Sequence, residues 1–240
     1  MKKYALITGA SGGIGQAVAS KLATLGYHLY LHYNQNGESI KFLMEKLQPF
    51  GGEYIPIQAD LSKPEGYKVI SSQIFSVDDI IYCSGVSHYG LIMDLKQAEA
   101  DELIGVHVRT PLMLTKELLP KLISKRSGNI IVVSSIWGQT GASCEVAYSA
   151  VKGAQIAFVK ALSKEVALNG IRVNAIAPGA INTPMMGRFT QDDLAQLEEE
   201  IPMGRLGLPE EIADGVAFLI SDQSSYITGQ ILSMNGGWYT

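Results

Sequence analysis

The stretch Thr8-Gly9-Ala10-Ser11-Gly12-Gly13-Ile14-Gly15 directly follows an apolar run at residues 4–8 and opens an amphipathic helical pattern at residues 14–25. Glycines permit a tight turn, and the free N–H groups at a helix N-terminus bind phosphate well. The spacing differs from Gly-x-Gly-x-x-Gly but serves the same geometry between a first strand and a first helix. The stretch therefore predicts a dinucleotide-binding turn. Its candidate pyrophosphate contacts are Gly9, Ser11, Gly13, Ile14 and Gly15.

Short apolar strands alternate with helical patterns along the rest of the chain. Strand-like runs lie at residues 4–8, 27–33, 54–57, 79–83, 129–134, 172–177 and 230–233, and helical patterns at 14–25, 38–47, 65–74, 98–125, 146–168 and 210–221. This alternation implies right-handed crossovers and a parallel sheet that is covered on both faces. We predict a doubly wound α/β Rossmann fold with a seven-stranded parallel sheet, formed by residues 1–240 as one domain.

Residues 182–209 interrupt this alternation with prolines and glycines around an acidic helical piece at 192–200. Thr190, with Asp193 three residues later, has the spacing of a helix-capping box. Insertions after the late strands of an α/β sheet lie above the ligand crevice. We predict a substrate lid at about residues 183–208, with an inert surface excursion as the alternative.

The composition excludes several functional classes. The 240 residues are 47% hydrophobic and 18% charged, with a net charge of −4 and no long basic block, which argues against a polynucleotide partner. Cys83 and Cys144 lack metal or redox spacing, so free thiols in a reducing cytoplasm are expected. The first apolar run is too short for a signal peptide, and no later run could span a bilayer. We therefore expect a cytoplasmic protein without a nucleic-acid, membrane or metal partner.

A serine, a tyrosine and a lysine form the candidate catalytic group. Tyr148 and Lys152 are four residues apart before Gly153, so a helix would place them on one face, and Ser135 lies thirteen residues upstream of Tyr148. An ammonium beside a phenol lowers the tyrosine pKa, by at most about three units if about 4 Å separate the charges. Such a tyrosine is a usable general acid for a carbonyl oxygen. An ordinary surface Tyr and Lys is the alternative.

The end of the second strand bears on the choice of nucleotide. A carboxylate there would bind the adenosine 2′-hydroxyl of NAD, but Leu31-His32-Tyr33-Asn34-Gln35 contains no acid before Glu38. This favours NADP(H) over NAD(H), although no arginine or lysine is nearby, and it makes Asn34 a candidate contact. Asp60 and Leu61, after the third strand, are candidates for the adenine site, with an acid at a helix N-terminus as the alternative.

Together these motifs resemble the short-chain dehydrogenase/reductase family. Pro178-Gly179-Ala180-Ile181-Asn182-Thr183 resembles the family's Pro-Gly turn after the sixth strand, whose Ile and Thr positions contact the nicotinamide carboxamide. The ending, Tyr226-Ile227-Thr228-Gly229-Gln230 and then Asn235-Gly236-Gly237, is particularly similar to bacterial 3-oxoacyl-acyl-carrier-protein reductases. The resemblance covers essentially the whole chain. It also implies a homotetramer built on the helices at 98–125 and 146–168.

The resemblance assigns roles to the candidate residues. Tyr148 is the implied proton donor, Lys152 binds the nicotinamide ribose and lowers the tyrosine pKa, and Ser135 polarises the substrate carbonyl, with Ser134 as its rival. The implied nicotinamide-side contacts are Tyr148, Lys152, Pro178, Gly179, Ile181 and Thr183.

Three departures from the family pattern are visible. His107 stands where the family has an asparagine that supports a water-linked proton path to the lysine, so it is either a catalytic substitute or a core histidine bonded to a backbone carbonyl. Tyr82-Cys83-Ser84-Gly85 replaces Asn-Asn-Ala-Gly: Gly85 keeps the close approach to the ribose, and Cys83 is expected in the core. Of the two basic positions that dock acyl carrier protein, Arg126 is matched and Asn169 is not.

The sequence thus predicts an NAD(P)H-dependent reductase that converts a ketone to a secondary alcohol, with the carbonyl on a small molecule or on a protein partner. Holding hydride donor, carbonyl and acid together is the source of the rate advantage. Two alternatives remain open: an alcohol or sugar dehydrogenase, and a dinucleotide-sensing protein with impaired catalysis.

Overall fold

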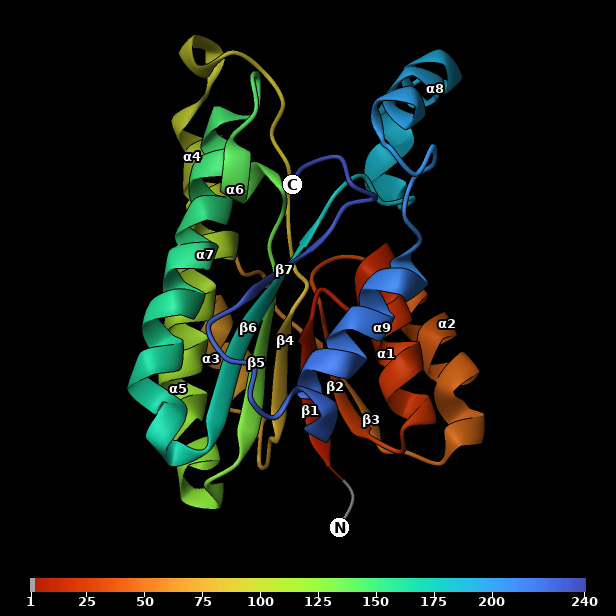
Figure 1. Ribbon diagram of the computed structural model, residues 1–240. Helices are drawn as coiled ribbons and strands as arrows, with labels where there is room; N and C mark the ends of the chain where they lie inside the picture. The colour runs from red at the N-terminus through yellow and green to blue at the C-terminus, as the bar shows by residue number, and fades with distance from the viewer. Residues whose placement is uncertain (1–2) are drawn as a thin grey trace.

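The computed structural model describes residues 3–240, which build one parallel sheet of seven strands in the order β3-β2-β1-β4-β5-β6-β7 (Figure 1). The strands are β1 (Tyr4–Thr8), β2 (His28–Tyr33), β3 (Tyr54–Gln58), β4 (Asp79–Tyr82), β5 (Gly128–Val133), β6 (Ile171–Pro178) and β7 (Ile231–Met234). The predicted Rossmann topology is confirmed, and each strand lies within two residues of its predicted bounds.

Two layers of helices cover the sheet. One face carries α1 (Gly13–Thr24), α2 (Gly37–Leu47) and α9 (Pro209–Ile220), and the other carries α3 (Gly66–Ser71), α5 (Thr110–Lys125) and α7 (Val146–Val166) (Figure 1). The central residues of strand β1 are apolar because both faces of the strand are covered. Ala5 and Ile7 join the core under α1 and α9, whereas Leu6 joins the core under α3 and α5, because successive side chains point to opposite faces.

The predicted continuous helix at 98–125 is interrupted. The structure has α4 (Gln97–Ile104), a π-helical turn η3 (Gly105–Arg109) and then α5. Pro111 lacks an N–H, and a proline ring in a helix clashes with the carbonyl four residues earlier, here that of His107. The Thr110 N–H bonds to the carbonyl of Gly105, five residues back, which is the π pattern.

Smaller elements also differ from the predicted ones. The helix α3 ends at Ser71, and α7 gives way to the 3-10 turn η4 (Ala167–Asn169). The short helix α6 (Trp137–Thr140) was not predicted. The 3-10 turns η1 (Gln48–Phe50), η2 (Ile92–Asp94) and η6 (Asp222–Ser224) complete the connections.

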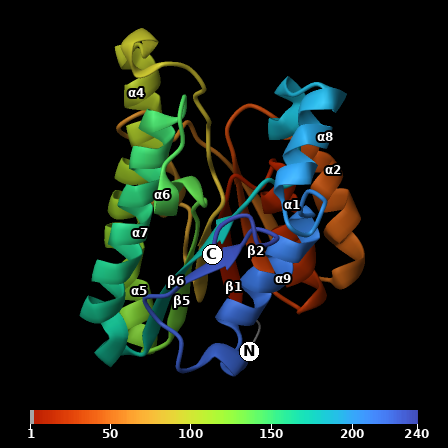
Figure 2. The same cartoon turned by 45° about the horizontal axis from the view of Figure 1, so that its top comes forward.

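The segment after β6 contains η5 (Pro184–Arg188) and α8 (Gln191–Glu200). In both views α8 projects beyond the carboxyl ends of the strands on the side of α1 and α9, while α4 and α6 project on the side of α7 (Figures 1 and 2). The Thr190 hydroxyl accepts from the Asp193 N–H at 3.2 Å, and the Asp193 carboxylate accepts from the Thr190 N–H at 2.9 Å. The predicted capping box is confirmed.

Candidate active site

The glycine turn between β1 and α1 is packed too tightly for side chains. Gly9 has φ +70°, and a Cβ there would lie 2.6 Å from Cα of Ser84. A Cβ at Gly15 would overlap the carbonyl oxygen of Gly9, and one at Gly13 would lie 2.8 Å from the Thr183 methyl group. These glycines therefore let the turn approach both the segment after β4 and the segment after β6.

His32 supports this turn from β2, which the sequence did not predict. The Gly9 N–H donates to Nδ1 of His32 at 3.0 Å, and Nε2 lies 3.0 Å from the carbonyl of Ala59. Burial lowers the pKa of His32 to about 4, so the ring is neutral and Nε2–H is the donor. The sequence feature that could have indicated this role is a polar residue, His32, within an otherwise apolar strand.

The N-terminus of α1 is suited to an anion. Its N-cap, Gly12, offers no side-chain cap, and its first turn holds no acidic residue. By contrast, α2 is capped by Asn36 and carries Glu38, and α8 is capped by Thr190 and carries Asp193. Because the first N–H groups of a helix have no partners within it, α1 keeps donors and positive potential for a pyrophosphate.

The residues predicted for the adenosine end lie at the ends of β2 and β3. Asn34 is exposed, and its carbonyl accepts from the Gln58 amide at 2.9 Å. The Asp60 carboxylate accepts from the N–H and hydroxyl of Ser62 at 3.0 and 2.6 Å, and these bonds lower its pKa. Leu61 is 3% exposed, so its side chain belongs to the core, and only its main chain is left for adenine.

Lys152 is a buried amine beside Tyr148. Its Nζ donates to the carbonyl of Val133, at the end of β5, at 2.9 Å and lies 5.5 Å from the centroid of the Tyr148 ring. Lys152 is 4% exposed and, among residues 3–240, has no carboxylate within ion-pair distance. Burial therefore lowers its pKa to about 7. A buried ammonium with one carbonyl partner has donors left for ligand hydroxyl groups.

The two serines after β5 have different partners. The Ser134 hydroxyl donates to the main-chain carbonyl of Lys152 at 3.1 Å, which ties β5 to α7. Ser135 Oγ accepts from the Trp137 N–H at 3.1 Å and keeps its own proton for another acceptor. The geometry therefore favours Ser135 over Ser134 as the carbonyl donor. The unpredicted α6 packs on α7 here, since a Cβ at Gly138 would lie 2.7 Å from the Lys152 carbonyl carbon.

His107 is buried between the segment after β4 and α7. Its Nε2 lies 2.8 Å from the carbonyl of Val86, and its ring meets that of Tyr148 edge-on at 5.7 Å. A Cβ at Gly85 would lie 3.1 Å from its Cε1. Burial, with the charge of Lys152, lowers the pKa of His107 to about 3, so the ring is neutral. The structure shows the bond to a backbone carbonyl that one of the two interpretations expects, with the imidazole packed edge-on against Tyr148.

The turn after β6 meets the glycine turn. The Pro178 carbonyl accepts from the Ile136 N–H at 3.0 Å, and a Cβ at Gly179 would lie 2.9 Å from Cα of Asn235. Ile181 is 7% exposed, and Thr183 covers Gly13. The predicted nicotinamide-side and pyrophosphate-side residues thus lie on adjoining turns.

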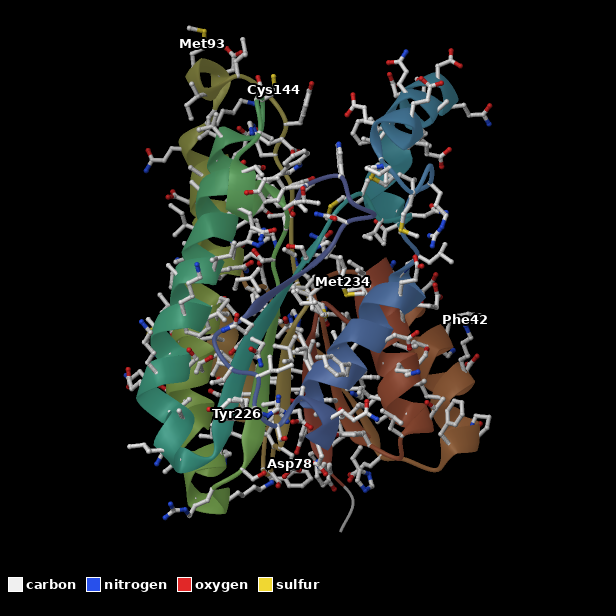
Figure 3. The ribbon with its side chains drawn as sticks, viewed as in Figure 1. Phe42, Asp78, Met93, Cys144, Tyr226 and Met234 are labelled. Carbon is white, nitrogen blue, oxygen red and sulfur yellow. The ribbon has the colours of Figure 1, made fainter. Side chains whose placement is uncertain are left out.

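The cysteines have no redox geometry. Cys83 packs against the core, and burial raises its thiol pKa to about 12, as expected for an inert thiol. Cys144 lies in the α6–α7 loop, near the upper end of the molecule in Figure 3, and its carbonyl accepts from the Gly90 N–H at 2.8 Å.

Within residues 3–240, no group of three or more His, Cys, Asp or Glu side chains could hold a metal ion. In the same part of the chain, no helix combines the length and hydropathy that a membrane span requires.

The site combines a glycine turn at an uncapped helix N-terminus with a serine, a tyrosine and a buried lysine at the same edge of the sheet. This combination is typical of a dinucleotide-dependent oxidoreductase. The comparisons agree. A family model described as enoyl-(acyl carrier protein) reductase matches residues 9–239. The chain belongs to the short-chain dehydrogenase/reductase family and is an NAD(P)-dependent enzyme of that family.

The relatives match over their whole length. The chain is 55% identical to the uncharacterized oxidoreductase YmfI of Bacillus subtilis (strain 168), covering 100% of both chains. It is 37% identical to the 3-oxoacyl-[acyl-carrier-protein] reductase FabG of Staphylococcus epidermidis, again covering 100% of both. The solved structure of the angucycline C-6 ketoreductase LanV with bound NADP matches with a TM-score of 0.92 at 26% identity, covering 98% of this chain and 95% of that one.

Proposed function

We propose that this enzyme uses NADPH to reduce the ketone of a 3-oxoacyl thioester, carried by a protein or by a small thiol, to a secondary alcohol. The observation that carries the proposal is the buried Lys152 beside Tyr148, bonded to the Val133 carbonyl and, among residues 3–240, without a carboxylate partner. The names of the FabG relatives and of the LanV structure support a ketone as the substrate.

The chain's residues divide the chemistry as follows. The dihydronicotinamide, when bound, supplies the hydride for the ketone carbon. The Ser135 hydroxyl donates a hydrogen bond to the ketone oxygen, and Tyr148 gives that oxygen its phenolic proton. The Lys152 ammonium stabilises the phenolate that is left on Tyr148. The phenolate then recovers a proton from solvent. His107, which is neutral and packed on Tyr148, holds the phenol in place.

The proposed cofactor contacts follow the edge of the sheet. The glycine turn and the first N–H groups of α1 hold the pyrophosphate, while Lys152 and the backbone at Gly85 hold the ribose. Residue 34, after the second strand, is an asparagine and not an acid that would bind the 2′-hydroxyl of NADH. This and the NADP bound in the LanV structure support NADPH over NADH. The proposed contacts are Gly9, Ser11, Gly13, Ile14, Gly15, Asn34, Asp60, Leu61 (by its main chain), Gly85, Tyr148, Lys152, Pro178, Gly179, Ile181 and Thr183.

Other expectations remain part of the proposal. Residues 1–240 act as one domain, and the segment at about 183–208 closes over the substrate as a lid. The enzyme works in the cytoplasm as a homotetramer, without a nucleic-acid, membrane or metal partner. Only one of the two basic positions that dock acyl carrier protein is present, Arg126, since the second is Asn169, so the protein partner need not be acyl carrier protein.

The test is oxidation of NADPH in the presence of an acetoacetyl thioester, a crotonyl thioester and a panel of simple ketones. We expect turnover with the 3-oxoacyl thioester and none with the crotonyl compound, which has no ketone. Tyr148→Phe should lower kcat by about 10²–10⁴-fold, the usual contribution of a general acid, with NADPH binding unchanged within about twofold. Tyr226→Phe, at a fully exposed tyrosine labelled in the lower part of Figure 3, is the matched control.

Each alternative has its own result in this assay. NADPH binding without turnover of any ketone would support the sensor. Faster oxidation of alcohols or sugars than reduction of any ketone would support the dehydrogenase. Full activity of Tyr148→Phe would refute the role of the phenol.

A further inference from the structure

Gln155 is a buried amide on the face of α7 that also carries Lys152. The two residues are three apart, so they are neighbours on one helix face. Gln155 is 3% exposed, and its Nε2 donates to the main-chain carbonyl of His107 at 3.1 Å. Its Oε1 is buried and has no hydrogen-bond partner in the described part of the chain. A buried amide is costly, so a single bond to the neighbouring π turn calls for an explanation.

The His107 carbonyl has lost its ordinary donor. In an α-helix that carbonyl would accept from the N–H of residue 111, but residue 111 is proline. The chain passes through the π turn η3 at this point instead, and the amide of Gln155 supplies a donor from a different helix. Both residues therefore affect the His107 carbonyl: Pro111 has no N–H to donate to it, and the Gln155 amide donates instead.

The side chain of His107 depends on this main-chain position. Its Nε2 bonds to Val86, its Cε1 sits against Gly85, and its ring packs edge-on against Tyr148 at 5.7 Å. The titratable groups facing it are Tyr148 and Lys152 on α7, and Cys83, after β4, interacts with Lys152. A shift of the π turn would move the imidazole against the phenol and change the surroundings of the lysine.

We propose that Gln155 is a positioning residue of the reductase: its amide fixes the His107 carbonyl in the π turn and thereby holds Tyr148 and Lys152 in their working arrangement. This inference rests on the proposed function. Gln155 acts through the His107 carbonyl, so its main effect should appear in the proton-transfer step.

The first variant is Gln155→Leu, which keeps the volume and removes the donor. We expect kcat to fall about tenfold, since small misplacements of catalytic groups are costly, with the NADPH dissociation constant within about twofold of wild type. The pH profile of kcat should shift, because the surroundings of Lys152 change. Thr115→Val, on α5, is the matched control: it removes a buried bond of 2.8 Å to the Tyr82 hydroxyl on β4 and should lower stability without changing kcat or the pH profile.

A second variant separates position from stability. Pro111→Ala combined with Gln155→Leu restores an N–H four residues after His107, so the carbonyl is satisfied within its own helix. We expect this pair to regain the melting temperature that Gln155→Leu loses while kcat stays low. Recovery of kcat together with stability would reduce Gln155 to a structural role and overturn the proposal. Failure of the pair to fold would overturn the explanation of why the carbonyl needs Gln155.

Failure of this inference differs from failure of the proposed function. A wild-type enzyme that reduces no ketone contradicts the function, whatever Gln155 does. An active wild type whose Gln155→Leu variant keeps both kcat and the pH profile contradicts only the positioning role.

Discussion

Mild acid should destabilise this fold through His107, which is buried and neutral against Val86 and Tyr148. An unfolded chain exposes the same imidazole, which then takes up a proton with its ordinary pKa of 6.5, whereas burial lowers the folded value to about 3. The unfolded state therefore binds more protons throughout the interval between those values. Stability is fully present above the unfolded pKa and is lost progressively as the pH falls below it.

The size of the effect follows from the two pKa values. Between pH 7 and pH 5 the unfolded chain takes up most of a proton at this position and the folded chain almost none, so the free energy of unfolding falls by about 2 kcal/mol. His32, whose pKa burial lowers to about 4, should contribute a similar amount. Together the two histidines should remove about 4 kcal/mol, a large share of the stability of an ordinary domain.

Urea unfolding at both pH values measures this directly. His107→Asn removes the titrating ring and keeps an amide for the Val86 carbonyl, so its pH 7 to pH 5 loss should be about 2 kcal/mol smaller than that of wild type. Thr115→Val, which removes a bond between groups that do not titrate in this range, should keep the full wild-type loss. An equal pH dependence in wild type and His107→Asn would show that the folded histidine takes up its proton, and the reasoning would be wrong.

Two further predictions concern the cofactor site. Gly15→Ala places a Cβ on the carbonyl of Gly9, so NADPH binding followed by fluorescence should weaken by at least about tenfold; unchanged affinity would mean that the turn is not as tight as described. Asn34→Asp introduces a carboxylate that accepts from a 2′-hydroxyl and repels a 2′-phosphate, so the ratio of kcat/KM for NADPH over NADH should fall by about tenfold or more. A constant ratio would place the adenosine ribose away from residue 34.

Local patterns were sufficient where they are physically self-contained. Strands such as β1 and β5 are buried on both faces of a parallel sheet, and so their central residues appear as continuous apolar runs. The capping box at Thr190 was predictable because its two residues satisfy each other's backbone within one turn. The long helix at 98–125 was predicted without its π turn, because periodicity does not record where a proline displaces a carbonyl.

What the sequence determined by itself was the order of strands and helices, the glycine turn, and the presence of Ser135, Tyr148 and Lys152, because each depends on residue type and short spacing. Tertiary structure alone decided that Ser134 binds the main chain of α7 while Ser135 keeps its proton, that His32 supports the glycine turn, and that Gln155 reaches His107. These contacts join residues from different elements. Their geometry depends on how helices and strands pack, and burial, which lowers the pKa values of His32, His107 and Lys152, exists only once that packing has formed.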